Sequence, residues 1–335
     1  MPRDYTHWIV AVETADSKEI GESIFKAAKE NPGLLIKGAV FPDVLYYLKK
    51  GSCYIVNVGD RLHGPRTEDT YDILRALLRK LIDILKNIRQ NQGNEESKRK
   101  EEKKRDYLLA FIVGVVTHIF SDVTFHPMVY HLTGDYYSCV SSTQDKAMIR
   151  HRTLECIFDL YFSDGFKRLF QYDEALKEWQ EEYEFIFDDL NLVFRCTDQA
   201  PRSIFRDAYR DLSGVREFIM KHKFLCKLLH WVNFLLPASV KKKVAVCYSE
   251  TQLRYIPEYS DTIAYRNPVT GEDSNMSLND LKKKAVDASI DFCVNHLAKY
   301  IEKEESNIAG RGPSLDTGIV NGSVDNMVYF NIAKF

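Results

Sequence analysis

The stretch "GVVTHIFSDVTFHPMVYH", Gly114 to His131, places three groups that are costly to bury inside an apolar run. His118, Asp122 and His126 follow one another at intervals of four residues. Four residues advance an α-helix by about 400°, so each side chain is rotated only about 40° from the last and the three share one face. Pro127 disfavours helical geometry at the preceding residue, so the helix is expected to end at His126 with its imidazole splayed outward.

A second pair repeats this spacing, because "HRTLE" puts His151 and Glu155 at positions i and i+4. Two helices that each present a histidine and a carboxylate can hold a metal ion between their facing sides. Zinc accepts both ligand types, and coordination satisfies groups that would otherwise be unpaired in a core. One such pair alone is usually a surface or capped pair, but the first follows "LLAFIVGVVT", which cannot be a solvated face. Further candidates in apolar or Gly/Pro contexts are His7, Asp43 and His63.

The composition is that of a globular chain with a sizeable core. Of 335 residues, 45% are hydrophobic and 28% charged, and the net charge of −2 gives no global field that would recruit nucleic acid or anionic membrane. The longest apolar run, Leu108 to Val116, is far shorter than the roughly 20 residues of a membrane span. The N-terminus has no signal pattern and the seven cysteines have no CxxC pair, so we expect reduced thiols and a cytoplasmic location.

Helical periodicity dominates and predicts one all-α domain over residues 1–306. Within it, residues 91–106 form a charged surface excursion, either a solvated loop or an exposed helix extension. Residues 307–335 have no helical period and are expected to form an irregular tail. Residues 263–275, "IAYRNPVTGEDSN", are turn-rich and predict a hairpin or a long loop. The expected helices are 17–30, 67–89, 105–125, 142–164, 175–194, 214–236 and 278–304.

Taken in sequence order, the eight candidate residues resemble the pattern of the zinc-dependent phospholipase C family, whose fold is shared with zinc nucleases that cut single strands. The eight are His7, Asp43, His63, His118, Asp122, His126, His151 and Glu155. The resemblance covers roughly the first half of the chain, from His7 to Glu155. The form "HIFSDVTFHP", with a histidine four residues after the aspartate, is closer to the GPI-specific phospholipase D branch of these proteins than to the bacterial phospholipases, in which that histidine lies further on. The resemblance implies the family's helical fold and the hydrolysis of a phospholipid or another phosphodiester.

The resemblance also implies three zinc ions. Asp43, His63 and His118 would hold the first, and Asp122 would bridge it to a second that His7 also binds. The third would be held by His126, His151 and Glu155. Three or four protein ligands with exchangeable water are typical of catalytic zinc. The carboxylates Asp43, Asp122 and Glu155 are the candidate catalytic residues.

The N-terminus departs from the pattern of secreted family members, in which the amine of an N-terminal tryptophan is itself a zinc ligand. Here the early tryptophan, Trp8, follows His7. If the initiator methionine is removed, the amine of Pro2 would complete the site of His7 and Asp122. A two-zinc site, or a water molecule in that position, is the alternative.

Two other functions remain open from the sequence. A zinc nuclease or other phosphodiesterase could use the same residues, although a nuclease is expected to have a basic cleft with stacking aromatic residues, so we expect no specific nucleic-acid partner. A helical scaffold could also keep a zinc site without turnover. His131, Tyr136 and Tyr137 follow the main motif and could line a cleft, although ordinary packing and hydrogen bonding is the favoured explanation.

Residues 216–243 form a basic and strongly apolar segment, "REFIMKHKFLCKLLHWVNFLLP" followed shortly by three lysines. A basic amphipathic helix of this kind, with Trp231 on it, can lie on a membrane surface and would give the protein a peripheral membrane contact. A bundle helix with one wet edge has the same pattern.

Overall fold

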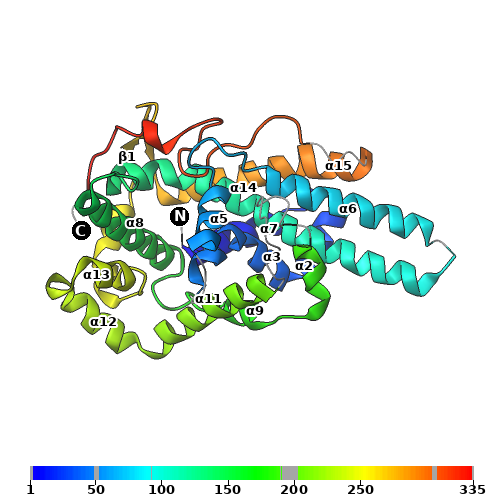
Figure 1. Ribbon diagram of the computed structural model, residues 1–335, viewed down its shortest axis with the longest axis horizontal. Helices are drawn as coiled ribbons and strands as arrows, with labels where there is room; N and C mark the ends of the chain where they lie inside the picture. The colour runs from blue at the N-terminus through cyan, green and yellow to red at the C-terminus, as the bar shows by residue number, and fades with distance from the viewer. Residues whose placement is uncertain are drawn as a thin grey trace.

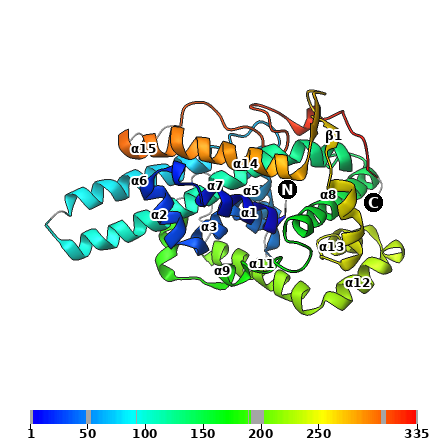
Figure 2. The ribbon, with the colours of Figure 1, turned by 180° about the vertical axis from the view of Figure 1, so that it is seen from behind.

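The computed structural model describes residues 3–48, 53–91, 93–188, 190, 203–303 and 308–333. Regular structure in these ranges is almost all helical, which confirms the predicted all-α class (Figures 1 and 2). The predicted hairpin is also present, with β1 (Ile263–Arg266) antiparallel to β2 (Asp273–Met276). The α-helices are α1 (Asp4–Ala15), α2 (Glu22–Glu30), α3 (Pro32–Ala39), α4 (Phe41–Val44), α5 (Cys53–Leu62), α6 (Asp72–Gln90), α7 (Glu95–Thr133), α8 (Ser141–Phe162), α9 (Asp173–Lys177), α11 (Ser203–Lys221), α12 (Lys223–Trp231), α13 (Ala238–Val244), α14 (Leu278–Phe292) and α15 (Ala298–Lys303). Shorter 3-10 turns are η1 (Lys18–Ile20), η2 (Leu45–Tyr47), η3 (Glu181–Phe187), η4 (Asn233–Leu235), η5 (Glu250–Tyr259) and η7 (Val324–Asn326), and Cys293–Leu297 is a π-helical turn.

Helix α7 is the central element, and α1, α2, α3, α6 and α14 all pack against it. Its C-terminal two thirds is buried almost throughout. Among the described helices it alone is long and apolar enough to cross a membrane, but 89% of its most apolar window is buried inside the protein. It is therefore the core helix of the fold.

The charged stretch before this core is the first part of the same helix. The side chain of Asn94 caps α7 by accepting a hydrogen bond from Ser97 N at 3.1 Å, and Glu95 and Glu96 occupy the first turn, where the helix dipole favours acidic groups. With α6 this part of α7 forms a helical hairpin that projects from the body of the molecule (Figure 1). Of the two expected forms, the exposed helix extension is the one present.

Helix α7 does not end at His126, so that prediction was wrong. The helix continues through Pro127 to Thr133. Pro127 has no N–H, so Val123 O lacks its usual helical hydrogen-bond donor. The C-terminal segment packs against the helix beside these two residues. A Cβ on Gly318 would lie 2.8 Å from Val123 O and 3.3 Å from Cγ of Pro127. Packing on all sides keeps His126 helical, with none of its surface exposed.

Two glycines let α3 and α7 touch backbone to backbone. A Cβ on Gly114 would lie 2.3 Å from Leu35 O and 2.6 Å from Ala39 N, and one on Gly38 would lie 2.2 Å from Phe111 O. Neither position can hold a larger residue without a shift of the helices. This contact sets the position of the chain that leads into α4.

Two other predicted helices are interrupted. The expected helix over 175–194 is instead α9 followed by the 3-10 turn Glu181–Phe187, and residues 189 and 191–194 lie outside the described ranges. The expected helix over 214–236 is divided between α11 and α12, with the break at His222. At the start of α6, Thr67 lies at φ +74°, five residues before the first helical residue, so the helix begins later than position 67.

The C-terminal segment, residues 308–333, returns across the end of the bundle that holds α5, α7 and α8 (Figure 1). Its backbone bonds to the turn after α5, through Leu315 N to His63 O and Val324 N to Pro65 O, both at 2.8 Å. It also bonds to the end of α7, through Asn331 N to His131 O at 2.7 Å. Residues distant in the sequence thus meet at one end of α7.

Candidate metal centre

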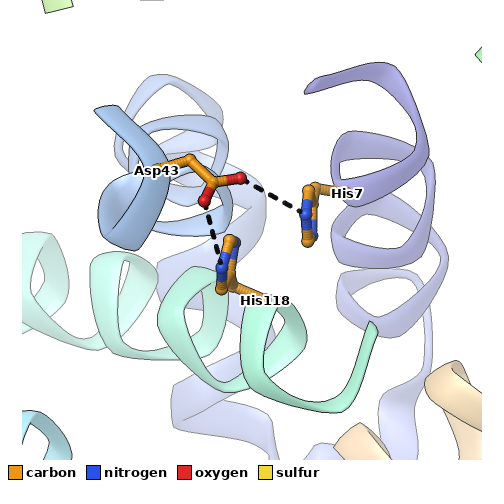
Figure 3. Close-up of side chains that lie close together, drawn as sticks. All are labelled: His7, Asp43 and His118. Atoms are coloured by element: carbon orange, nitrogen blue, oxygen red, sulfur yellow. Dashed lines mark ion pairs between the residues drawn. The ribbon is translucent and has the colours of Figure 1, made fainter. Parts of the chain in front are cut away.

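Five elements bring the eight candidate residues to one buried place. His7 comes from α1, Asp43 from α4 and His63 from the turn after α5; His118, Asp122 and His126 come from α7, and His151 and Glu155 from α8. None of the eight is more than 6% exposed. Figure 3 shows three of them, His7, Asp43 and His118, converging from their separate helices.

Asp122 lies at the centre of the group, and its two oxygens face different histidines. Oδ2 is 3.1 Å from Nε2 of His118 and 3.5 Å from Nε2 of His63. Oδ1 is 3.4 Å from Nε2 of His7 and 3.7 Å from Nε2 of His126. One carboxylate can therefore serve two neighbouring ions.

Asp43 closes the group from the side of α4. Its Oδ1 is 3.0 Å from Nε2 of His63 and 4.0 Å from that of His118, and its Oδ2 is 3.8 Å from Nε2 of His7. The rings of His7 and His118 are stacked, with centroids 4.1 Å apart. Two ligand sets result, one of His7, Asp43 and His118 and one of His63, His118 and Asp122.

A third set lies where α8 faces the end of α7. Nε2 of His151 is 2.9 Å from Oε1 of Glu155, one helical turn away. His126 completes this set, with its ring centroid 5.7 Å from that of His151. In each of the three sets, one ligand atom from every residue lies within 4.8 Å of the others.

Backbone carbonyls fix the orientation of three of the histidines. Nδ1 of His63 bonds to Gly59 O at 2.8 Å, Nδ1 of His118 to Ala39 O at 2.8 Å, and Nδ1 of His126 to Leu315 O at 2.6 Å. A carbonyl only accepts, so Nδ1 carries the proton and the lone pair of Nε2 points at the carboxylates. This outer hydrogen bond is typical of histidines that bind metals.

Several buried polar atoms of the centre make no hydrogen bond within the described part of the chain. They are both oxygens of Asp122, and Nε2 of His118 and His126. Burying such groups without partners is expensive, and carboxylates this close repel each other. Divalent cations would satisfy all of them at once, and mixed imidazole and carboxylate ligands suit zinc. The residues present therefore fit a zinc centre.

The titration of these groups follows from their burial and their neighbours. Burial raises the pKa of the Asp43 carboxyl, against the opposing effect of His118 and His63. Burial lowers the pKa of His63, but the carboxylate of Asp43 outweighs it and raises that pKa to about 9. Burial lowers the pKa of His126 well below its usual value, which keeps this ring in the neutral form that binds metal.

A cavity of about 390 Å³ opens onto the centre. The metal side of its wall contains Asp43, His63, His151 and Glu155. The rest of the wall is aromatic and charged, formed by Arg3, Asp4, Tyr46, Tyr47, Asp60, Tyr130, Tyr136, Tyr137, Arg152, Val215, Lys242, Lys243, Val246 and Asp316. Tyr136 and Tyr137 thus line the cleft, whereas Nδ1 of His131 bonds to Tyr329 O at 2.7 Å outside it.

Asp316 and Arg3 are among the charged residues of this cavity that sequence reasoning missed. Asp316 accepts hydrogen bonds from the hydroxyls of Tyr130 and Tyr137, both at 2.7 Å, and its Oδ1 is 3.6 Å from Nδ1 of His126. Arg3 is 5% exposed; its guanidinium lies 4.3 Å from the centroid of the Tyr248 ring. Neither residue has a sequence pattern around it that would have identified it. Pro2, whose amine was considered as a ligand, lies outside the described residues.

Comparison with known proteins agrees with this geometry. Neither a search of curated proteins nor one of solved structures gave a match. A family model described as zinc-dependent phospholipase C matches residues 6–210, which is more than half of the chain, and all eight candidate ligands lie within this span. The chain therefore belongs to the zinc-dependent phospholipase C family.

Proposed function

We propose that this protein is a zinc-dependent phosphodiester hydrolase that cleaves the glycerol-side P–O bond of a phospholipid, as a phospholipase C does. Water would attack phosphorus and the glycerol oxygen would leave with a proton, giving a diacylglycerol and a phosphorylated head group. The observation that carries the proposal is the set of eight buried ligand-type residues, four of which line an open cavity, in a chain of this family.

We further propose three ions. The lone pair of an Nε2 atom binds one ion, so His118 can belong to only one of the two sets that share it. We assign Asp43, His63 and His118 to the first ion, because Oδ1 of Asp43 faces both rings at 3.0 and 4.0 Å, and Asp122 would bridge to a second ion beside His7. His126, His151 and Glu155 would hold the third. Bound zinc would lower the pKa of a water molecule toward neutrality and neutralise charge on the phosphoryl and leaving oxygens.

Among the carboxylates, Asp43 is best placed to accept a proton during the reaction. It lines the cavity and is accessible from it, whereas Asp122 is fully buried behind it. Glu155, beside His151, is the second of the candidate catalytic carboxylates that line the cavity.

Arg3 places a positive charge on the wall of the same cavity. Its Nη1 donates to Sγ of Cys156 at 3.3 Å and its guanidinium lies 4.3 Å from the centroid of the Tyr248 ring, so the side chain is held in place. A guanidinium keeps its charge at every working pH, and this charge would attract a phosphoryl oxygen of the substrate.

We propose that the protein acts in the cytoplasm. The cysteines whose side chains are described, Cys139, Cys156, Cys226, Cys247 and Cys293, are all free thiols, as expected in a reducing compartment.

The test combines metal analysis with a panel of phosphodiesters: choline-linked phospholipid, nucleotide and simple aryl ester, each with and without chelator. We expect bound zinc and hydrolysis of the phospholipid that chelator abolishes. His118→Ala should remove zinc and activity with little loss of helical structure, and the exposed His296→Ala is the matched control, expected to behave as wild type.

Each other outcome identifies an alternative. Preference for the nucleotide ester would favour a nuclease or another phosphodiesterase on the same residues. Bound zinc with no hydrolysis of any ester, and a His118→Ala variant that loses only stability, would favour a scaffold.

A further inference from the structure

The second half of the chain carries a large exposed apolar surface. Among the described residues, the four most exposed large apolar side chains all lie between positions 224 and 235: Phe224 (80%), Trp231 (73%), Phe234 (74%) and Leu235 (72%). On α12 only Cys226 is buried. We call residues 218–243 the α12–α13 surface. A patch of this kind on a soluble protein marks an interaction site.

The exposed side chains point the same way along the helix. Phe224, Leu228 and Trp231 follow one another at intervals of four and three residues, so they share one face of α12. The 3-10 turn η4 continues this apolar face with Phe234 and Leu235. The wide apolar face predicted from the sequence is therefore turned outward and is not covered by the bundle.

Positive charge surrounds this apolar face. The α12–α13 surface contains six lysines and neither aspartate nor glutamate, in a chain whose net charge is −2. Three of the lysines pair with acidic residues outside it: Lys227 with Glu250 at 2.7 Å, Lys242 with Asp145 at 2.6 Å, and Lys221 with Glu217. When these three acids are subtracted from the six lysines, the surface keeps an excess of three positive charges.

The surface is continuous with the mouth of the metal cavity. Lys242 and Lys243, on α13, line that cavity. Nη1 of Arg152 donates to Lys242 O at 2.9 Å, which ties α13 to α8, the helix that carries His151 and Glu155. Figures 1 and 2 both show α12 and α13 side by side, next to α8. Whatever binds this surface lies beside the entrance to the catalytic site.

We infer that the α12–α13 surface docks the protein on an anionic lipid membrane, with the aromatic and leucine side chains inserted among the acyl chains and the lysines at the head groups. An apolar stripe bordered by lysine is typical of helices that lie in the membrane interface, and the cytoplasmic leaflet is negatively charged. A second copy of the chain is disfavoured as the occupant, since the two faces would bring excess positive charge together. The choice of a lipid partner rests on the proposed function as a phospholipid hydrolase.

The test uses the full-length protein and sedimentation with vesicles, either of phosphatidylcholine alone or of phosphatidylcholine with a third phosphatidylserine. Wild type should bind the anionic vesicles, at least tenfold more tightly than the neutral ones, and less tightly at high salt. A Phe234→Ser/Leu235→Ser variant should bind at least tenfold more weakly. Val328→Ser, which changes a side chain 67% exposed in another part of the molecule, is the matched control and should bind as wild type.

Trp231 provides a second readout. It is 73% exposed, whereas Trp8 is fully buried, so insertion should shift the tryptophan emission to the blue when anionic vesicles are added. The Trp231→Phe variant should lack the shift. Circular dichroism of each variant checks that it is folded.

Three results would overturn the inference: no binding to anionic vesicles, equal binding by wild type and the Phe234→Ser/Leu235→Ser variant, or a wild-type dimer that this variant converts to a monomer. Hydrolysis of a soluble short-chain ester separates this inference from the proposed function. Vesicle binding without hydrolysis of any ester would refute only the enzyme, and hydrolysis without vesicle binding would refute only the docking surface.

Discussion

Replacing Gly114 with alanine should separate α3 from α7 and weaken the metal centre at a distance. The added Cβ would lie 2.3 Å from Leu35 O and 2.6 Å from Ala39 N. Both partners are backbone atoms inside a helix, so no side chain can rotate away. Non-bonded heavy atoms prefer separations of about 3.5 Å, so the helices must move apart by roughly 1 Å.

The cost follows from this movement. Over-packing of a dense core destabilises by about 1–3 kcal/mol, and we expect about 3 kcal/mol here because both clashing atoms belong to the backbone. Ala39 O also accepts the hydrogen bond of Nδ1 of His118 at 2.8 Å. A shift of about 1 Å would break that bond, and loss of such outer contacts weakens metal binding by about 10- to 100-fold.

The assay is denaturant unfolding together with competition for zinc against a chelator. Gly33→Ala is the matched control in α3, the helix that Gly114 contacts, because its Cβ would meet only Ala175 O at 3.9 Å and the change should cost nothing in either assay. If Gly114→Ala has the stability and zinc affinity of wild type, the close contact between α3 and α7 does not position His118 and the reasoning fails.

Three further predictions concern other parts of the site and fold. Asp316→Asn should weaken zinc binding about tenfold, because the hydroxyls of Tyr130 and Tyr137 lose a charged acceptor beside the third ligand set. Competition with a chelator measures the zinc affinity, and the exposed Asp325→Asn is the control. Equal zinc affinities of the two variants would contradict the prediction. Lys37 is 1% exposed, and burial lowers its pKa from 10.5 to about 8. Below pH 8 its buried charge therefore lowers the free energy of unfolding, and this loss of stability disappears as the pH rises from about 8 to 10.5. Lys37→Met should therefore flatten the rise in unfolding free energy over this window by roughly 3 kcal/mol, and parallel profiles for the two proteins would refute the assignment. Because the pKa of His63 beside Asp43 is raised to about 9, zinc binding at pH 7 should release a proton from that ring, and zinc should bind more tightly as the pH rises toward 9. Calorimetry in buffers of different ionisation enthalpy measures the number of protons released, and no release at pH 7 would contradict the prediction.

The helical part of the centre could be predicted because its geometry is local. The spacing of His118, Asp122 and His126 determines which side of a helix they share, whatever packs around it. The end of that helix could not be predicted in the same way. The preference against a helical residue before Pro127 is small, and the packing of the distant Gly318 outweighs it.

The remaining parts of the site depend on contacts that no local pattern encodes. Asp316 lies in "GRGPSLDTG", which has no period, and reaches the cavity because the C-terminal segment pairs with the turn after α5. The direction of the apolar face of α12 is also decided by tertiary structure. A wide apolar stripe has the same sequence whether it faces a core or solvent, and the structure turns Phe224 and Trp231 outward.

The hydrogen bond from His126 to Leu315 O joins residues 189 positions apart. During translation, all eight ligand residues leave the ribosome long before this carbonyl is made. The ring of His126 is thus held in place only after position 315 has been made, so a nascent chain, or one clipped by a protease before position 315, would have every ligand and still lack a finished third site. Maturation of the centre is in this way coupled to synthesis of the segment that carries Leu315.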